Sequence, residues 1–171
     1  MNGQILVDAF DHHVWATTTL IDACLALPPE QLGTSAAGTY GSLRDTIRHL
    51  VDSDATYLSA FEGTRGSGLD ADLMSVADWR AEMAGHRARW RAALDREFEP
   101  TEMIVRHRVN GSQSHAPAGI RFAQALVHGA DHRSHIATIL TTLGVEPPDV
   151  DAWAFGQSQG RIHEVPPPPT A

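Results

Sequence analysis

Lysine is absent from this 171-residue chain, and all thirteen basic residues are arginine. The lack of lysine excludes Schiff-base chemistry, a lysine general base and the phosphate-binding P-loop, which requires that residue. Cys24 is the single cysteine, so no internal disulfide forms, which is typical of a reducing compartment. No apolar run approaches the roughly 18 residues of a membrane span, and no signal peptide is evident. We therefore expect a cytoplasmic protein with no membrane partner.

Positive charge is outweighed by negative charge, which gives the chain a formal net charge of -8. An acidic chain is repelled by the phosphates of nucleic acids and by anionic membrane surfaces, so neither is expected as a partner. Apolar residues make up 42% and charged residues 20% of the chain, proportions that indicate a folded protein rather than a disordered one.

Apolar residues recur at intervals of three and four along four segments, which predicts four long helices. With their capping serines and terminating prolines and glycines, these helices are expected at 3–27, 43–62, 76–97 and 118–143. Residues 102–109 alternate like a short strand, but no second strand accompanies them, so we expect an irregular excursion and negligible sheet. The pattern predicts an all-α four-helix bundle with long connections.

The bundle is expected to form one domain over residues 1–155. Within it, the segment from Asp149 to Phe155 predicts a short turn of helix. Residues 156–171 are expected to form a proline-rich C-terminal tail, extended at Pro166 to Pro169. We find no internal repeat and no further domain boundary.

Histidine, by contrast, is abundant, with ten residues. His128 and His132 are four residues apart, so on a helix they lie about 40° apart on one face, a spacing that allows both to bind one metal ion. His135 faces the same way. Burying such imidazoles without partners costs on the order of 1–3 kcal/mol each, a cost that a metal removes. Hydrogen-bonded core histidines or a solvated face explain the same spacing, and a third ligand from another helix would decide between them.

His49 is the candidate third ligand. It lies about 100° from the apolar stripe of its predicted helix, beside small polar residues that suit a cavity wall. From its spacing alone, a surface histidine is an equally good interpretation. His13 lies on the apolar stripe of the first predicted helix, as a hydrogen-bonded core residue or a cavity group. The histidines without a spacing partner are expected at the surface: His12, His86, His107, His115 and His163.

Five segments, in their order and spacing, resemble the DinB/YfiT-like superfamily of metal-binding four-helix bundles. The segment FDHHVWA at 10–16 resembles the family's aromatic-x-x-Asn-x-Trp-Ala opening, with His13 in place of the asparagine. The segment HGADHR at 128–133 resembles its His-x-x-x-His-Arg helix. The other segments resemble its Leu-Pro-x-Glu corner, its second helix ending in a ligand histidine, and its exit; they lie at 27–30, 42–50 and 143–151.

The resemblance implies a four-helix bundle, often a homodimer, that holds a divalent metal on three histidines. Matched residue by residue, those ligands are His49, His128 and His132. Where the family often has a glutamine after the last ligand, this chain has His135, which leaves room for a fourth ligand or an acid–base group. Some members resemble S-transferases and isomerases that use mycothiol, bacillithiol or glutathione.

Three neutral imidazoles leave an open position on a divalent ion such as Zn, Ni or Fe. Asp131 and Asp52 each lie one turn from a ligand, so either is open as an additional ligand. Water at the open position has a pKa near ~7 on zinc, and a thiol there is deprotonated. The same site therefore serves hydrolysis by bound hydroxide or transfer of a low-molecular-weight thiol.

Our preferred interpretation is a metal-dependent enzyme that acts on a small-molecule substrate, most specifically a mycothiol-type thiol S-transferase. Arginine without lysine, together with many alanines, is typical of a GC-rich genome and favours mycothiol among the thiols. His135 and His13 are the candidate acid–base residues. The alternatives are a metal-dependent hydrolase and a non-catalytic, dimeric metal-binding bundle.

Overall fold

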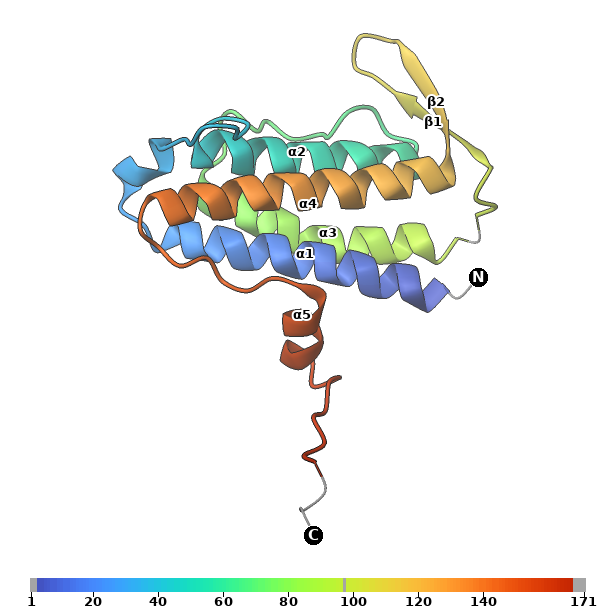
Figure 1. Ribbon diagram of the computed structural model, residues 1–171. Coiled ribbons are helices and arrows are strands. Elements are labelled where there is room, and N and C mark those ends of the chain that lie inside the picture. The colour runs from blue at the N-terminus through green and yellow to red at the C-terminus, as the bar shows by residue number, and fades with distance from the viewer. Residues whose placement is uncertain (1–2, 97, 168–171) are drawn as a thin grey trace.

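The computed structural model describes residues 3–96 and 98–167, and four long helices dominate it (Figure 1). In chain order these are α1 (Gly3–Leu25), α2 (Leu43–Glu62), α3 (Val76–Leu94) and α4 (Ala118–Thr142). A 3-10 turn, η1 (Pro29–Gly33), follows α1, and a short helix, α5 (Ala152–Ser158), follows α4. The prediction of a four-helix bundle is confirmed, and the predicted ends of the four helices lie within three residues of the observed ones.

Local sequence explains where α2 and α3 begin. The Ser42 hydroxyl accepts a hydrogen bond from the backbone N–H of Asp45 at 3.1 Å, and the Asp45 carboxylate accepts one from the backbone N–H of Ser42. Ser75 and Asp78 form the same capping box at the start of α3. Gly63 ends α2 in the left-handed region, with a φ of 71° that favours glycine. These boundaries are therefore encoded locally, which is why the sequence pattern located them.

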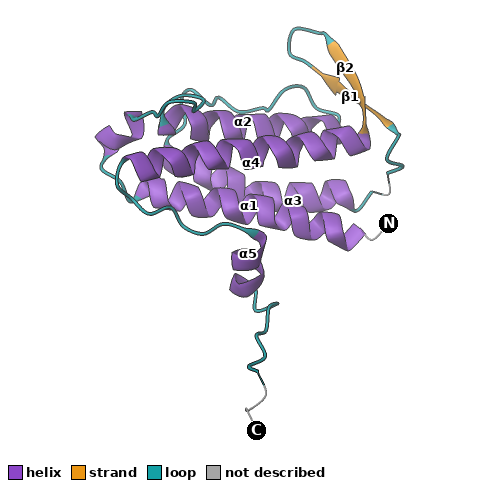
Figure 2. Cartoon of the chain, in the orientation of Figure 1, coloured by secondary structure: helices purple, strands orange, loops and turns teal. Residues whose placement is uncertain are grey.

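The connection between α3 and α4 contains a hairpin that the sequence pattern did not predict. Strand β1 (Met103–His107) pairs antiparallel with β2 (Gln113–Pro117), so the expectation of an irregular excursion was wrong. The hairpin projects from one end of the bundle (Figure 2), and Ile104 is the one buried residue of its two strands. Because β2 packs so little against the core, it lacks the apolar alternation of a half-buried strand. Arg121 of α4 anchors the hairpin by donating to the carbonyl oxygens of Ile104 and Ser114.

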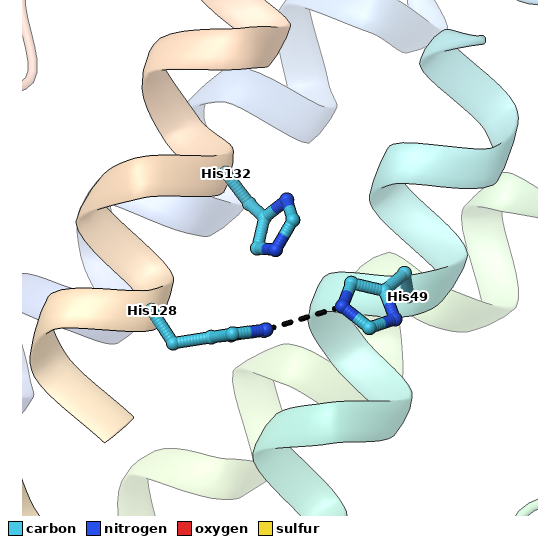
Figure 3. Close-up of side chains that lie close together, drawn as sticks. All are labelled: His49, His128 and His132. Atoms are coloured by element: carbon cyan, nitrogen blue, oxygen red, sulfur yellow. Dashed lines mark hydrogen bonds between the residues drawn. The ribbon is translucent and has the colours of Figure 1, made fainter. Parts of the chain in front are cut away.

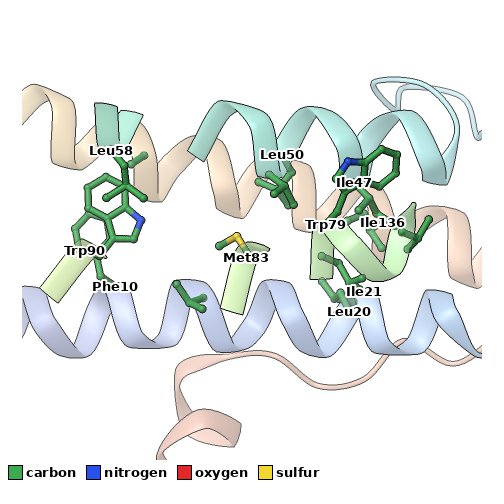
Figure 4. Close-up of a cluster of buried hydrophobic side chains, with 14 of the residues drawn as sticks. Phe10, Leu20, Ile21, Ile47, Leu50, Leu58, Trp79, Met83, Trp90 and Ile136 are labelled. Atoms are coloured by element: carbon green, nitrogen blue, oxygen red, sulfur yellow. The ribbon is translucent and has the colours of Figure 1, made fainter. Parts of the chain in front are cut away.

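All four long helices contribute to one apolar core (Figure 4). Helices α1 and α2 each contact both α3 and α4, so they lie at opposite corners of the bundle. This arrangement places α2 beside α4, although they are far apart in the sequence. None of the described helices has the length and apolar character that a bilayer crossing requires. The largest buried side chains include Phe10, Leu20, Ile21, Ile47, Leu50, Leu58, Met83, Trp90 and Ile136.

The segment after α4 packs against α1. The predicted short helix is observed as α5, whose first turn is capped by the Asp151 carboxylate accepting from the backbone N–H of Ala154 at 2.7 Å. Beyond α5, Arg161 donates two hydrogen bonds to the carboxylate of Asp8 in α1, at 2.9 and 2.7 Å. The predicted extended run at 166–169 lies partly outside the described residues, and a domain boundary at residue 155 stays a prediction.

Candidate metal centre

Helices α2 and α4 bring three histidines together (Figure 3). His49 extends from α2, while His128 and His132 extend from successive turns of α4. The Nε2 atoms of His49 and His128 are 3.1 Å apart, and one ring nitrogen of each of the three residues lies within 4.8 Å of the others. Figure 3 shows a ring nitrogen of His132 directed toward the other two rings. The three histidines that were expected as ligands therefore lie close together.

The spacing of the Nε2 atoms of His49 and His128 fits a divalent ion. Two nitrogens bound about 2.0–2.1 Å from one ion are about 3.4 Å apart at a tetrahedral angle and about 2.9 Å apart at a right angle. The observed separation of 3.1 Å between His49 Nε2 and His128 Nε2 falls between these values. A set of three imidazoles is also one that zinc, nickel and ferrous iron accept.

The surroundings of the three histidine rings favour the neutral form that binds a metal cation. Burial, together with the neighbouring His132 and His49, lowers the pKa of His128 to about 4. Burial likewise lowers the pKa of His49 and of His132. Only the neutral imidazole is a metal ligand, so these low pKa values leave all three rings deprotonated at neutral pH, where protons compete little with a metal.

Two tyrosines flank the histidines. Tyr40, in the loop before α2, stacks on His49 with ring centroids 4.1 Å apart and planes inclined by 15°, and it meets His132 edge-on at 5.2 Å. Tyr57 of α2 meets His128 edge-on at 5.4 Å. The sequence interpretation missed both. Tyr57 follows His49 by eight residues, which places it on the same face of α2 and was a usable signal, whereas nothing in the sequence indicates Tyr40.

His135 lies beside the three histidines rather than among them. Its ring is 5.2 Å from that of His132, and its Nε2 is 4.0 Å from the Oδ1 atom of Asp131. Asp131, His132 and His135 form a second group with potential ligand atoms within 4.8 Å of one another. Asp52 instead accepts a hydrogen bond from Ser67 at 2.6 Å, and it belongs to neither of the groups found among the described residues.

His13 is a core residue whose ring nitrogens are both engaged. Its Nδ1 accepts a hydrogen bond from Arg133 Nη1 at 2.9 Å, so the proton of the neutral ring is on Nε2, which donates to Asp54 at 3.0 Å. The side chain is 1% exposed and belongs to neither histidine group of the described chain. Arg133 is itself buried, and burial lowers its pKa to about 10, so it stays cationic at neutral pH.

Asp54 links His13 to a second buried histidine, His86. Its other carboxylate oxygen accepts from His86 Nδ1 at 2.7 Å and from Trp90 Nε1 at 3.0 Å. Burial acts to raise the pKa of Asp54, but its interactions with His13 and His86 outweigh burial and hold that pKa below its usual value. Since His86 is fully buried, the expectation that it lies at the surface was wrong. Asp54 of α2 supplies a tertiary partner inside the bundle, and Glu82, four residues earlier on α3, lies 3.1 Å from His86 Nε2.

His12 was also expected at the surface, but it is half-buried, and its Nε2 donates to the carbonyl oxygen of Val150 at 2.8 Å. His115 and His163 are exposed, as expected, and His107 is half-buried in the hairpin. The backbone that follows α4 therefore covers His12, a contact that its position on α1 does not encode.

Comparison with known proteins supports the fold and the family. The structure is similar to that of YfiT from Bacillus subtilis, described as a probable metal-dependent hydrolase with an unusual four-helix bundle topology. The TM-score is 0.60 at 16% sequence identity, over 85% of this chain and 91% of YfiT. Comparison with proteins of curated function gives no significant match. The sequence profile of the DinB family matches residues 1–166, and the chain belongs to that family.

Proposed function

We propose that the protein is a metal-dependent enzyme in which His49, His128 and His132 hold one divalent cation. The observation that carries this proposal is the convergence of three imidazoles from two helices, with two of their nitrogens 3.1 Å apart. Three protein ligands leave a position for a small molecule, as in catalytic rather than structural zinc sites. A cation bound there lowers the pKa of a water or thiol and so supplies a nucleophile at neutral pH.

His135 is the residue best placed to move a proton. Its side chain is 21% exposed and packs edge-on against His132, and its buried Nδ1 has no partner among the described residues. A neutral imidazole in this position accepts a proton from the incoming nucleophile and returns it to the leaving group. His13, the other acid–base candidate from the sequence, is committed to Asp54 and Arg133, so we assign it to positioning α4 against α1.

The more specific proposal is S-transfer from a low-molecular-weight thiol of the mycothiol type to a small-molecule substrate. It is supported by the compatibility of nitrogen-ligated zinc, nickel or iron with a sulfur ligand and by a composition typical of a GC-rich genome. Family resemblance supports a homodimer, and the single cysteine supports a cytoplasmic location. The second candidate is a hydrolase with water as the nucleophile, which the similarity to YfiT favours. A non-catalytic metal-binding dimer is the third.

The metal content of the protein tests the proposed metal site independently of the proposed reaction. Elemental analysis of the purified protein is expected to give one divalent ion per chain. His128→Ala and His132→Ala are each expected to lose it, because two imidazoles do not replace three. His115→Ala, in the exposed hairpin, is the matched control and should retain the metal. Stoichiometric metal in a His128→Ala, His132→Ala double variant would show that the ligands are wrongly assigned.

Cobalt spectroscopy then distinguishes the nucleophiles. Cobalt-substituted protein is titrated with mycothiol, bacillithiol and glutathione in turn. A sulfur-to-cobalt charge-transfer band with one of them is the result expected for an S-transferase. No band, together with hydrolysis of small esters or amides, would establish the hydrolase instead. If neither a charge-transfer band nor turnover is observed, the non-catalytic metal-binding bundle is the function that remains.

A further inference from the structure

A groove between α1, α4 and α5 lies apart from the three histidines, none of which lines it. Its volume is about 640 Å³, within the range of roughly 300–1,000 Å³ that is typical of small-molecule sites. Its walls are mainly apolar, and Arg133 contributes the charge nearest the core. The residues that matter for recognition are Leu126, Ala130 and Arg133 of α4, Trp153 and Phe155 of α5, and Ile162.

Fixed contacts preform one wall of this groove. The paired hydrogen bonds from Arg161 to Asp8 join the segment after α5 to α1. Ile162 packs directly on Gly156, where a Cβ atom would lie 2.6 Å from Ile162 Cδ1. Because this wall is already ordered, little free energy is spent on ordering it when a ligand binds.

Arg133 is a buried cation without a carboxylate partner in the described chain. It is 8% exposed, and its Nη1 donates to two uncharged acceptors, His13 Nδ1 at 2.9 Å and Thr17 Oγ1 at 3.3 Å. Arginine is seldom buried unless it is paired. The arginines that do form ion pairs within residues 3–96 and 98–167 are Arg48, Arg80, Arg87, Arg89, Arg91 and Arg161.

One edge of the Arg133 guanidinium has no hydrogen-bond partner in the described chain. Its Nε and Nη2 atoms donate to no described group, and they are not among the fully buried polar atoms that lack a partner. Arg133 lines the groove, so a ligand bound there lies beside this guanidinium. Together, Nε and Nη2 form the side-on fork that binds both oxygens of a carboxylate.

We propose that this groove binds a small amphipathic carboxylate, with the carboxylate on Nε and Nη2 of Arg133 and the apolar body against Leu126, Phe155 and Trp153. The ligand supplies the negative charge that Arg133 lacks, and its body fills the apolar walls. This site is separate from the histidine centre and does not depend on the proposed enzymatic function.

Octanoate is the probe, and its binding is measured by tryptophan fluorescence and by calorimetry. Trp153 is 69% exposed and lines the groove, so its emission reports occupancy. The protein carries His128→Ala and is treated with chelator, which prevents the carboxylate from binding a metal at the histidines. Octanamide has the same chain without the charge. We expect its affinity to be at least about tenfold lower, because a charge-assisted hydrogen-bonded pair is lost.

Two substitutions on α4 locate the site without disturbing the buried Arg133. Ala130→Phe fills the groove from an exposed position and is expected to abolish octanoate binding. Ala123→Phe is the same change at an exposed position outside the groove, and octanoate should bind this variant as it binds the parent. Equal affinity for octanoate and octanamide, or unchanged binding by Ala130→Phe, would overturn the proposal. So would a parent protein that binds no octanoate and forms a dimer that Ala130→Phe dissociates, since a second copy would then cover the groove.

Discussion

Gly129 and His13 are in contact only because residue 129 has no side chain: a Cβ atom there would lie 2.2 Å from His13 Cε1. Gly129 sits between His128 and His132 on α4, and it is buried. The missing side chain lets α1 approach α4 closely enough for His13 to accept a hydrogen bond from Arg133. Gly129 thus allows the α4 segment that carries His128 and His132 to pack against the buried, hydrogen-bonded His13 of α1.

Gly129→Ala is therefore expected to destabilise the protein despite the better helix propensity of alanine. Overpacking a core costs about 1–3 kcal/mol, against which the gain in helix propensity is about 1 kcal/mol. The measurement is the free energy of unfolding from urea denaturation. Gly85→Ala is the matched control, because Gly85 is an exposed helical glycine with nothing within 4 Å of an added Cβ, and it should be stabilising. Equal stability changes in the two variants would contradict the contact.

Asp54→Asn is expected to be among the most destabilising isosteric changes in the chain. The side chain, which is 2% exposed, accepts hydrogen bonds from His13, His86 and Trp90, and breaking such a buried charged network costs about 3–5 kcal/mol. The control is Asp22→Asn, which breaks an exposed ion pair with Arg80 and should cost less than about 1 kcal/mol. Urea denaturation at pH 7 compares them, and similar losses would show that the Asp54 network contributes little.

The helices were predictable because their signals are local. The serine caps at Ser42 and Ser75 and the terminating Gly63 are read from a few adjacent residues. The hairpin was missed, since β2 gains its partner from β1 and from Arg121 rather than from its own pattern.

The candidate site divides in the same way. A spacing of four residues identifies His128 and His132, because residues four apart are neighbours on any helix. His49 needs the packing of α2 beside α4, which spacing does not encode and family resemblance supplied. Tyr40 stacks on His49 from a loop, which is a tertiary contact. His86 takes one partner, Asp54, from α2 and the other, Glu82, from one turn earlier on its own helix, so only the first of these is tertiary.

Tyr40→Ala is expected to weaken divalent metal binding by about tenfold, the effect of removing a group that orients a ligand. The stacked ring holds His49 in the orientation that faces the α4 histidines. Tyr40→Phe retains the ring and should bind metal like the parent, since the stack does not use the hydroxyl. Competition titration with a chromophoric chelator measures both affinities. If phenylalanine and alanine weaken binding equally, the hydroxyl rather than the stack is what matters.

The metal-free protein is expected to lose stability as the pH falls below about 6.5, the ordinary histidine pKa. Burial lowers the pKa of His128 to about 4 and also lowers those of His49 and His132. Between these values the unfolded chain binds more protons than the folded one, so the free energy of unfolding rises with pH. The contribution of these rings is complete above the unfolded pKa and is lost as the pH falls through the folded values.

Urea denaturation of chelator-treated protein at intervals from pH 4 to pH 7 measures this dependence. His128→Gln removes the most strongly shifted group and should flatten the rise, whereas His115→Gln, in the exposed hairpin, should leave it unchanged. A saturating divalent ion should make the same rise steeper, because protons then compete with the metal for the three rings. Equal slopes in the two glutamine variants would show that the acid sensitivity arises elsewhere in the chain, and a slope indifferent to metal would remove these histidines from the ligand set.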